Sequence, residues 1–144
     1  MNKNTMIPDK KIYNLKYTLN LPKGKFEMSE DIKSLLQESP KVTEAYILLT
    51  EIKIYLNCKN DFRPRIKVRI YENTFLESEP YTYELSHYVK TPLQFGSYVS
   101  NLNSLETESA AVEKAIEDVV SYINRAIDAG HEPSENWLIP NENW

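Results

Sequence analysis

The most chemically suggestive part of the sequence is a run of cationic residues at every second position. The cations are Arg63, Arg65, Lys67 and Arg69, and aliphatic residues separate the last three. In a β-strand this spacing places them on one face, about 6.6–7 Å apart. Because the guanidinium group offers a planar fork of donors that fits a phosphate, the run predicts contact with a phosphate-bearing anion. An ordinary solvated face, whose cations pair with Glu51 or with acids of the long helix, explains the same residues.

A second group of candidate binding residues lies in the segment 91–104. Aromatic and amide side chains surround Gly96 there. Phe95 or Tyr98 could stack on a nucleobase, and Asn101 could hydrogen-bond to a polar edge of a base or ribose. A plain edge strand followed by a turn is an equally good interpretation of this segment.

Signatures of catalysis, metal binding and cofactor binding are missing. With three glycines in total, the chain has no glycine-rich phosphate loop. His87, His131 and Cys58 are too few for a zinc site unless an interface supplies more ligands. No sequence context supports Cys58 and His87 as a nucleophile and base, and the acids Glu117 and Asp118 fit a solvated helix face. We therefore predict a protein that is not an enzyme and has no cofactor.

Length and composition indicate one domain in a reducing cytoplasm. The 144 residues suffice for a core of their own. The single cysteine cannot form an intrachain disulfide, and the N-terminus lacks the apolar stretch of a secretory signal. The longest apolar-rich run, residues 45–49, is too short to span a bilayer. We expect a single domain over residues 1–144 with no membrane contact.

The charges are unevenly distributed along the chain. Residues 1–73 contain 14 lysines and arginines against 9 acids, whereas residues 74–144 contain 3 against 12, and the net charge is −4. This asymmetry predicts either a basic sheet packed on an acidic helix or a basic surface that binds an anion. Duplex nucleic acid is not expected as a partner, because it requires an extended positive footprint.

A long helix over residues 109–130 is the clearest element that would support these candidate residues. Apolar residues recur there with the period of a helix that has one buried face: Val112, Ala115, Ile116, Val119, Val120, Ile123, Ala126 and Ile127. Thr107 or Ser109 can cap its start, and Gly130 suits the position after its end.

Alternating patterns predict strands over residues 11–21, 44–57, 65–71 and 81–89. Helix is an alternative for residues 43–49. A short helix begins after Ser29, residues 1–9 form a loose arm, and the tail 132–144, with two tryptophans, docks on the sheet or on a second subunit. The predicted fold class is α+β, with an N-terminal antiparallel sheet of about four strands covered by one long C-terminal helix plus a short helix, since short links favour antiparallel neighbours.

The order of these elements, with the segment 94–101 (QFGSYVSN) and the helix end 124–131 (NRAIDAGH), resembles the first described type of phage Thoeris anti-defence sponges. This resemblance implies a protein that binds cyclic ADP-ribose isomers made by TIR-domain enzymes and sequesters them without cleavage in the host cytoplasm. It also implies a homo-oligomer with pockets at subunit contacts, an aromatic ring against the adenine and arginines on the pyrophosphate.

The candidate ligand contacts are assigned by chemistry. Arg65, Arg69 and Arg125 are expected at phosphate, Phe95 or Tyr98 at the base, and Asn101 at a polar edge. The alternative function is a phage inhibitor that binds a host protein through acids of the long helix region: Glu106, Glu108, Glu113, Glu117 and Asp118. A hydrolase of cyclic nucleotides is a third hypothesis.

Overall fold

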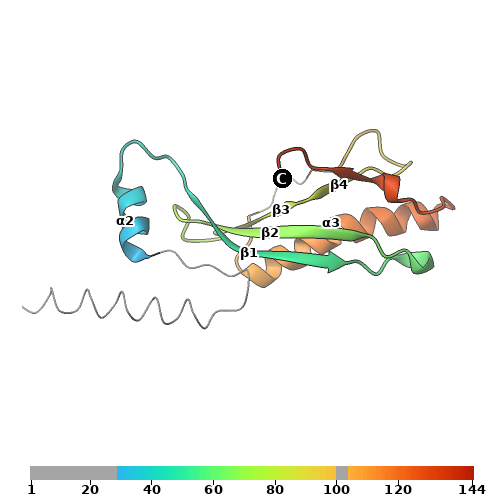
Figure 1. The fold of residues 1–144 in the computed structure, drawn as a ribbon, viewed down its shortest axis with the longest axis horizontal. Helices are drawn as coiled ribbons and strands as arrows, with labels where there is room; N and C mark the ends of the chain where they lie inside the picture. The colour runs from blue at the N-terminus through green and yellow to red at the C-terminus, as the bar shows by residue number, and fades with distance from the viewer. Residues whose placement is uncertain (1–28, 100–103) are drawn as a thin grey trace, which may run out of the picture.

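The computed structural model describes residues 29–99 and 104–144 and has the predicted α+β fold, with an antiparallel sheet packed against a long C-terminal helix (Figure 1). In chain order the elements are α2 (Glu30–Glu38), β1 (Tyr46–Tyr55), the short helical turn η1 (Lys59–Asp61), β2 (Arg65–Asn73), β3 (Tyr81–Leu85), β4 (His87–Val89), α3 (Glu108–Asp128), the short turn η2 (Glu135–Trp137) and β5 (Leu138–Pro140). The predicted arm 1–9 and strand 11–21 lie outside the described residues. None of the described helices combines the length and the apolarity needed to cross a bilayer.

The main sheet contains β1, β2 and β3 in that order, and both pairs are antiparallel. Residues 46–49 belong to β1, so the helical alternative for this part of the chain is wrong. The pairing shifts by one residue between Leu48 and Thr50, which is a β-bulge. A bulge reverses the phase of the alternation, so Ile47 before it and Ile52 after it face the same side of the sheet.

The predicted strand 81–89 is divided at Ser86 into β3 and β4, because the pairing partner changes there. The Ser86 backbone N–H donates to the carbonyl of Lys67 at 2.9 Å, and its hydroxyl accepts the Lys67 backbone N–H at 2.8 Å. Its carbonyl accepts from the backbone of Asn141 at 2.9 Å. The chain thus leaves β2 at Ser86 and continues as β4, which pairs with β5 in a second, two-stranded sheet.

Helix α3 covers one face of the main sheet. Thr107 is its N-cap and accepts the Ala110 backbone N–H at 3.0 Å, while Gly130 follows its end with φ +93°, a conformation that glycine adopts without strain. Val119 and Ile123 are fully buried in the core that this helix shares with the sheet. The prediction that Asp118 lies on a solvated face is wrong, because this side chain is only 4% exposed.

The short helix α2 has no buried residue and lies at one end of the molecule (Figure 1). Ser29 occupies the predicted N-cap position, although its hydroxyl makes no capping hydrogen bond. Polar contacts hold the helix, including Lys33 with Glu72 at 3.6 Å and the Gln37 amide with the Thr74 carbonyl.

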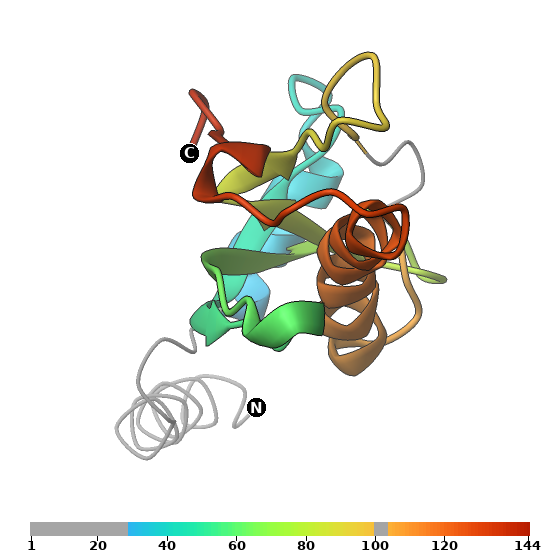
Figure 2. The same cartoon turned by 90° about the vertical axis from the view of Figure 1, so that its right-hand side faces the viewer.

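The C-terminal tail returns from the end of α3 and lies along β4 (Figure 2). Trp137 is buried in the core, where its ring meets Phe62 edge-on at a centroid distance of 6.4 Å. Its carbonyl accepts the Lys90 backbone N–H at 2.8 Å, and β5 follows at once. This anchoring places the last residues of the chain beside the outer face of the main sheet.

Candidate anion-binding groove

The cations of β2 lie on the face of the sheet that points away from α3, because Ile66, Val68 and Ile70 alternate with them and are fully buried. Arg69 donates from Nε to Glu51 Oε2 at 2.9 Å, and Lys67 Nζ lies 3.7 Å from the other oxygen of Glu51. The guanidinium group of Arg69 lowers the pKa of the Glu51 carboxyl below its usual value. These contacts match the solvated, paired interpretation of the cationic face for Arg69 and Lys67.

Arg65 differs from its neighbours, because it makes no ion pair with any carboxylate of the described residues. Two adjoining hollows share Arg65 and His87, and we call them together the basic groove. The first has a volume of about 390 Å³ and the second about 350 Å³. The lining of the first hollow is Tyr55, Arg63, Arg65, His87, Glu135 and Leu138. Lys67, Ser86, Asn141 and Trp144 are among the other residues that line the second.

The imidazole of His87 is half-buried between the two hollows. Its Nδ1 lies 2.9 Å from the hydroxyl of Ser86, which can donate to the neutral ring or accept from the charged one. Burial lowers the pKa of His87, nearby Arg65 lowers it further, and Glu135 opposes them. An anion that entered the groove would favour the imidazolium form and so gain a second charged donor.

Trp144 supplies an aromatic wall to the basic groove. The Cζ atom of Arg69 lies 3.9 Å from the centroid of the indole ring, which is a cation–π contact. The ring is half-buried and lines the second hollow. A guanidinium, an imidazole and an indole therefore border one recess, which suits a ligand that combines phosphate with an aromatic base.

The remaining predicted contacts lie elsewhere. Tyr98 stacks on Tyr122 of α3 with a centroid distance of 4.6 Å, and the Cζ atom of Arg125 lies 5.4 Å from the same Tyr122 ring. Phe95 is fully exposed on the loop after β4, and Asn101 lies outside the described residues. Among the described residues, no hollow has both the strand arginines and the loop rings in its lining, although the sequence leads us to expect one. The three-stranded sheet separates Arg65 and Arg69 from the Tyr98–Arg125 group.

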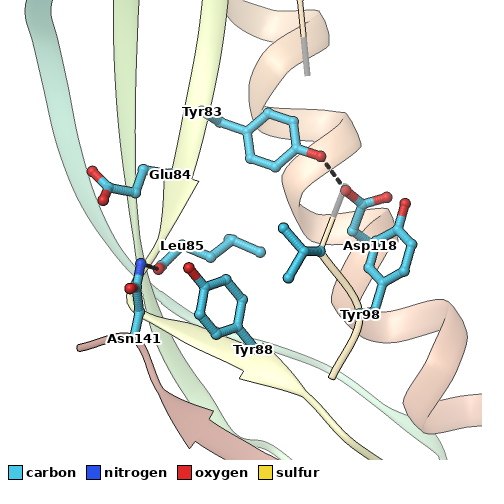
Figure 3. Close-up of a pocket in the computed structure, with 8 residues that line it drawn as sticks. Tyr83, Glu84, Leu85, Tyr88, Tyr98, Asp118 and Asn141 are labelled. Carbon is cyan, nitrogen blue, oxygen red and sulfur yellow. Dashed lines mark hydrogen bonds between the residues drawn. The ribbon is translucent and has the colours of Figure 1, made fainter. Parts of the chain in front are cut away.

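Another cavity, of about 150 Å³, lies at the β3 edge of the main sheet, next to α3 (Figure 3). We call it the tyrosine cavity, and its lining is Tyr83, Glu84, Leu85, Tyr88, Tyr98, Val99, Asp118 and Asn141. The phenol of Tyr83 donates to one carboxylate oxygen of Asp118, and Lys114 Nζ lies 2.5 Å from the other. The carboxylate in turn raises the pKa of Lys114. Asp118 is buried because these two donors replace the water that it would lose.

No protein-family model, curated protein or solved structure matches this chain.

Two residues of the basic groove, His87 and Trp144, could not be assigned to it from the sequence. His87 fits the alternating pattern of the predicted strand 81–89. This pattern does not indicate that the chain changes its pairing partner at Ser86. The two tryptophans of the tail predict that it docks, but they do not indicate which surface Trp144 contacts. Both residues lie beside β2 because of strand pairing between distant parts of the chain. Such pairing cannot be predicted directly from a single sequence.

Cys58 does not behave as an activated nucleophile. The thiol is buried in the core, and this burial raises its pKa. A reactive cysteine needs the opposite shift, since the thiolate is the attacking species. Among the described residues, no three histidine, cysteine or acidic side chains gather at a spacing that could hold a metal ion.

Proposed function

We propose that this protein binds a nucleotide in the basic groove and retains it without cleaving it. Arg65 and His87 contact the phosphates, and Trp144 packs against the base. The resemblance to Thoeris anti-defence sponges points to a cyclic ADP-ribose isomer as the ligand. Sequestration of this immune signal would be the biological role of the protein.

The observation that carries the proposal is that Arg65 and His87 are shared by both hollows, while Arg65 has no ion pair with a described carboxylate. An arginine without such an ion pair can bind a phosphate without breaking an existing salt bridge. The hollows measure about 390 and 350 Å³. Both volumes lie within the range of roughly 300–1,000 Å³ that is usual for small-molecule sites.

The alternative proposal, an inhibitor that binds a host protein through acids of the long helix region, is less well supported. Asp118 is buried and already has two donors, so it cannot contribute to an acidic contact surface. Glu106, Glu113 and Glu117 remain exposed, and Glu108 is half-buried. They leave a smaller negative patch than the sequence suggests.

Calorimetric titration with cyclic ADP-ribose isomers tests the proposal. We expect one site per chain with a dissociation constant at or below the micromolar range, which corresponds to about −8 kcal/mol. Heat denaturation of the loaded protein should then release the ligand with its chromatographic retention unchanged. Absence of binding would contradict the proposal, and a new product peak would show a hydrolase instead.

The affinity for such a ligand should depend on pH through His87. A bound pyrophosphate favours the imidazolium form, so binding raises the pKa of His87 from its lowered value in the free protein. Affinity should therefore rise as the pH falls through the range between these two pKa values and level off below it. Titrations at several pH values measure this slope, and His87→Gln should remove it. A slope that persists in His87→Gln would assign the proton to another group.

A further inference from the structure

Phe95 is the most exposed large apolar residue among the described residues. Phe95 lies on the loop that follows β4. This loop, drawn in yellow, projects from the body of the protein (Figure 2). Leu93 and Val99 of the same loop are also exposed. A single exposed apolar residue is ordinary, but three on one short loop mark a candidate contact surface, and we call this loop the apolar knob.

The tyrosine cavity lies at the base of the same loop. Val99 belongs to the exposed group and also lines the cavity, so knob and cavity adjoin. Figure 3 shows the rings of Tyr83, Tyr88 and Tyr98 around this space. Its volume is about 150 Å³. Apolar protein cavities of about this size hold a benzene ring, so the side chain of Phe95 matches it in size.

Several polar groups that line the cavity have partners within the chain. Asp118 accepts from Tyr83 and Lys114, Glu84 accepts the Tyr71 phenol at 3.0 Å, and the Asn141 amide donates to the Leu85 carbonyl at 2.9 Å. An apolar ring could therefore enter without depriving these three side chains of their partners. The tyrosine rings also offer faces for edge-to-face contact with the ring of Phe95.

We infer that two copies of this chain associate through the loop after β4, with Phe95 of each copy inserted into the tyrosine cavity of the other. Knob and cavity belong to the same patch, so a two-fold axis through this patch makes both contacts at once. The tyrosine cavity shares Asn141 with the lining of the basic groove, whose cations lie on the other face of the main sheet.

The oligomeric state of purified protein and of single variants tests this pairing. Sedimentation velocity over a range of concentrations should show a monomer–dimer equilibrium. Phe95→Ala should weaken the dimer at least about 100-fold, since each dimer loses two central aromatic anchors. The ring of Phe95 is fully exposed within one chain, so this variant should fold normally. Leu76→Ala removes an exposed apolar residue from the β2–β3 turn and should leave the dimer unchanged.

Two further measurements locate the contact. Val99→Trp should block the mouth of the cavity and prevent association although Phe95 is present. A benzophenone amino acid at position 95 should crosslink to peptides that contain Tyr83, Tyr88 or Tyr98 of the other copy. A wild-type protein that stays monomeric at the highest concentration, or a Phe95→Ala dimer of unchanged affinity, would overturn the inference. A monomer whose cavity binds a small phenol would overturn it too and indicate a ligand site there.

Discussion

Replacing Arg65 by alanine should abolish most of the affinity for a cyclic ADP-ribose isomer. A hydrogen bond to a charged group contributes about 1.5–3 kcal/mol, so the dissociation constant should rise roughly 10- to 150-fold. The fold should be unaffected, because Arg65 is exposed and forms no ion pair with a described carboxylate. Arg65→Lys should restore only part of the affinity, since an ammonium group keeps the charge but loses the planar fork. Calorimetric titration of the three proteins under identical conditions gives the comparison.

Arg125→Ala is the matched control for this experiment. The sequence assigns both arginines to phosphate, but the structure places Arg125 on α3, next to Tyr122 and on the other side of the sheet from Arg65. We expect the affinity of Arg125→Ala to equal that of the wild type. If Arg125→Ala lost affinity while Arg65→Ala kept it, the ligand would bind on the α3 side, and the basic groove would not be the site.

The features of the fold that could be predicted are those set by local periodicity. The alternation of Ile66, Val68 and Ile70 defines β2 and its buried face, and the 3.6-residue period defines α3. The bulge near Leu49 is less visible, because it appears in the sequence only as a change in the phase of the apolar residues. The division of the predicted strand into β3 and β4 at Ser86 does not change the alternating pattern of the sequence, because hydrogen bonds to distant parts of the backbone cause it.

The candidate site shows the same division between local and non-local information. Arg65 could be found from its type and spacing, because its environment depends on its own strand. Asp118 could not be placed correctly, since its burial depends on Tyr83, which is 35 residues away. Trp144 and Arg69 meet only because β5 carries the tail across to β2. Chemical type thus identifies candidate ligand groups, whereas long-range pairing decides which of them meet.

Trp137→Ala should give the largest loss of stability among these variants. The ring is 6% exposed and packs against Phe62 within the core. Removing a buried tryptophan side chain costs about 3–5 kcal/mol in the free energy of unfolding, a large share of the total for a single domain. Urea denaturation followed by circular dichroism measures this loss without relying on tryptophan fluorescence. Affinity should fall as well, because Trp137 anchors β5 and the part of the tail that borders the basic groove.

Trp144→Ala should show the reverse pattern. This ring is half-buried and lies against the guanidinium group of Arg69, so its removal should cost about 1 kcal/mol of stability, the usual value of a cation–π contact near the surface. The dissociation constant should nevertheless rise by about 5- to 150-fold, since base stacking on an aromatic side chain contributes about 1–3 kcal/mol. Of these two tryptophans, Trp137 would thus stabilise the fold and Trp144 would contact the ligand. Equal effects of both variants on stability and affinity would mean that Trp144 only holds the tail in place and touches no base.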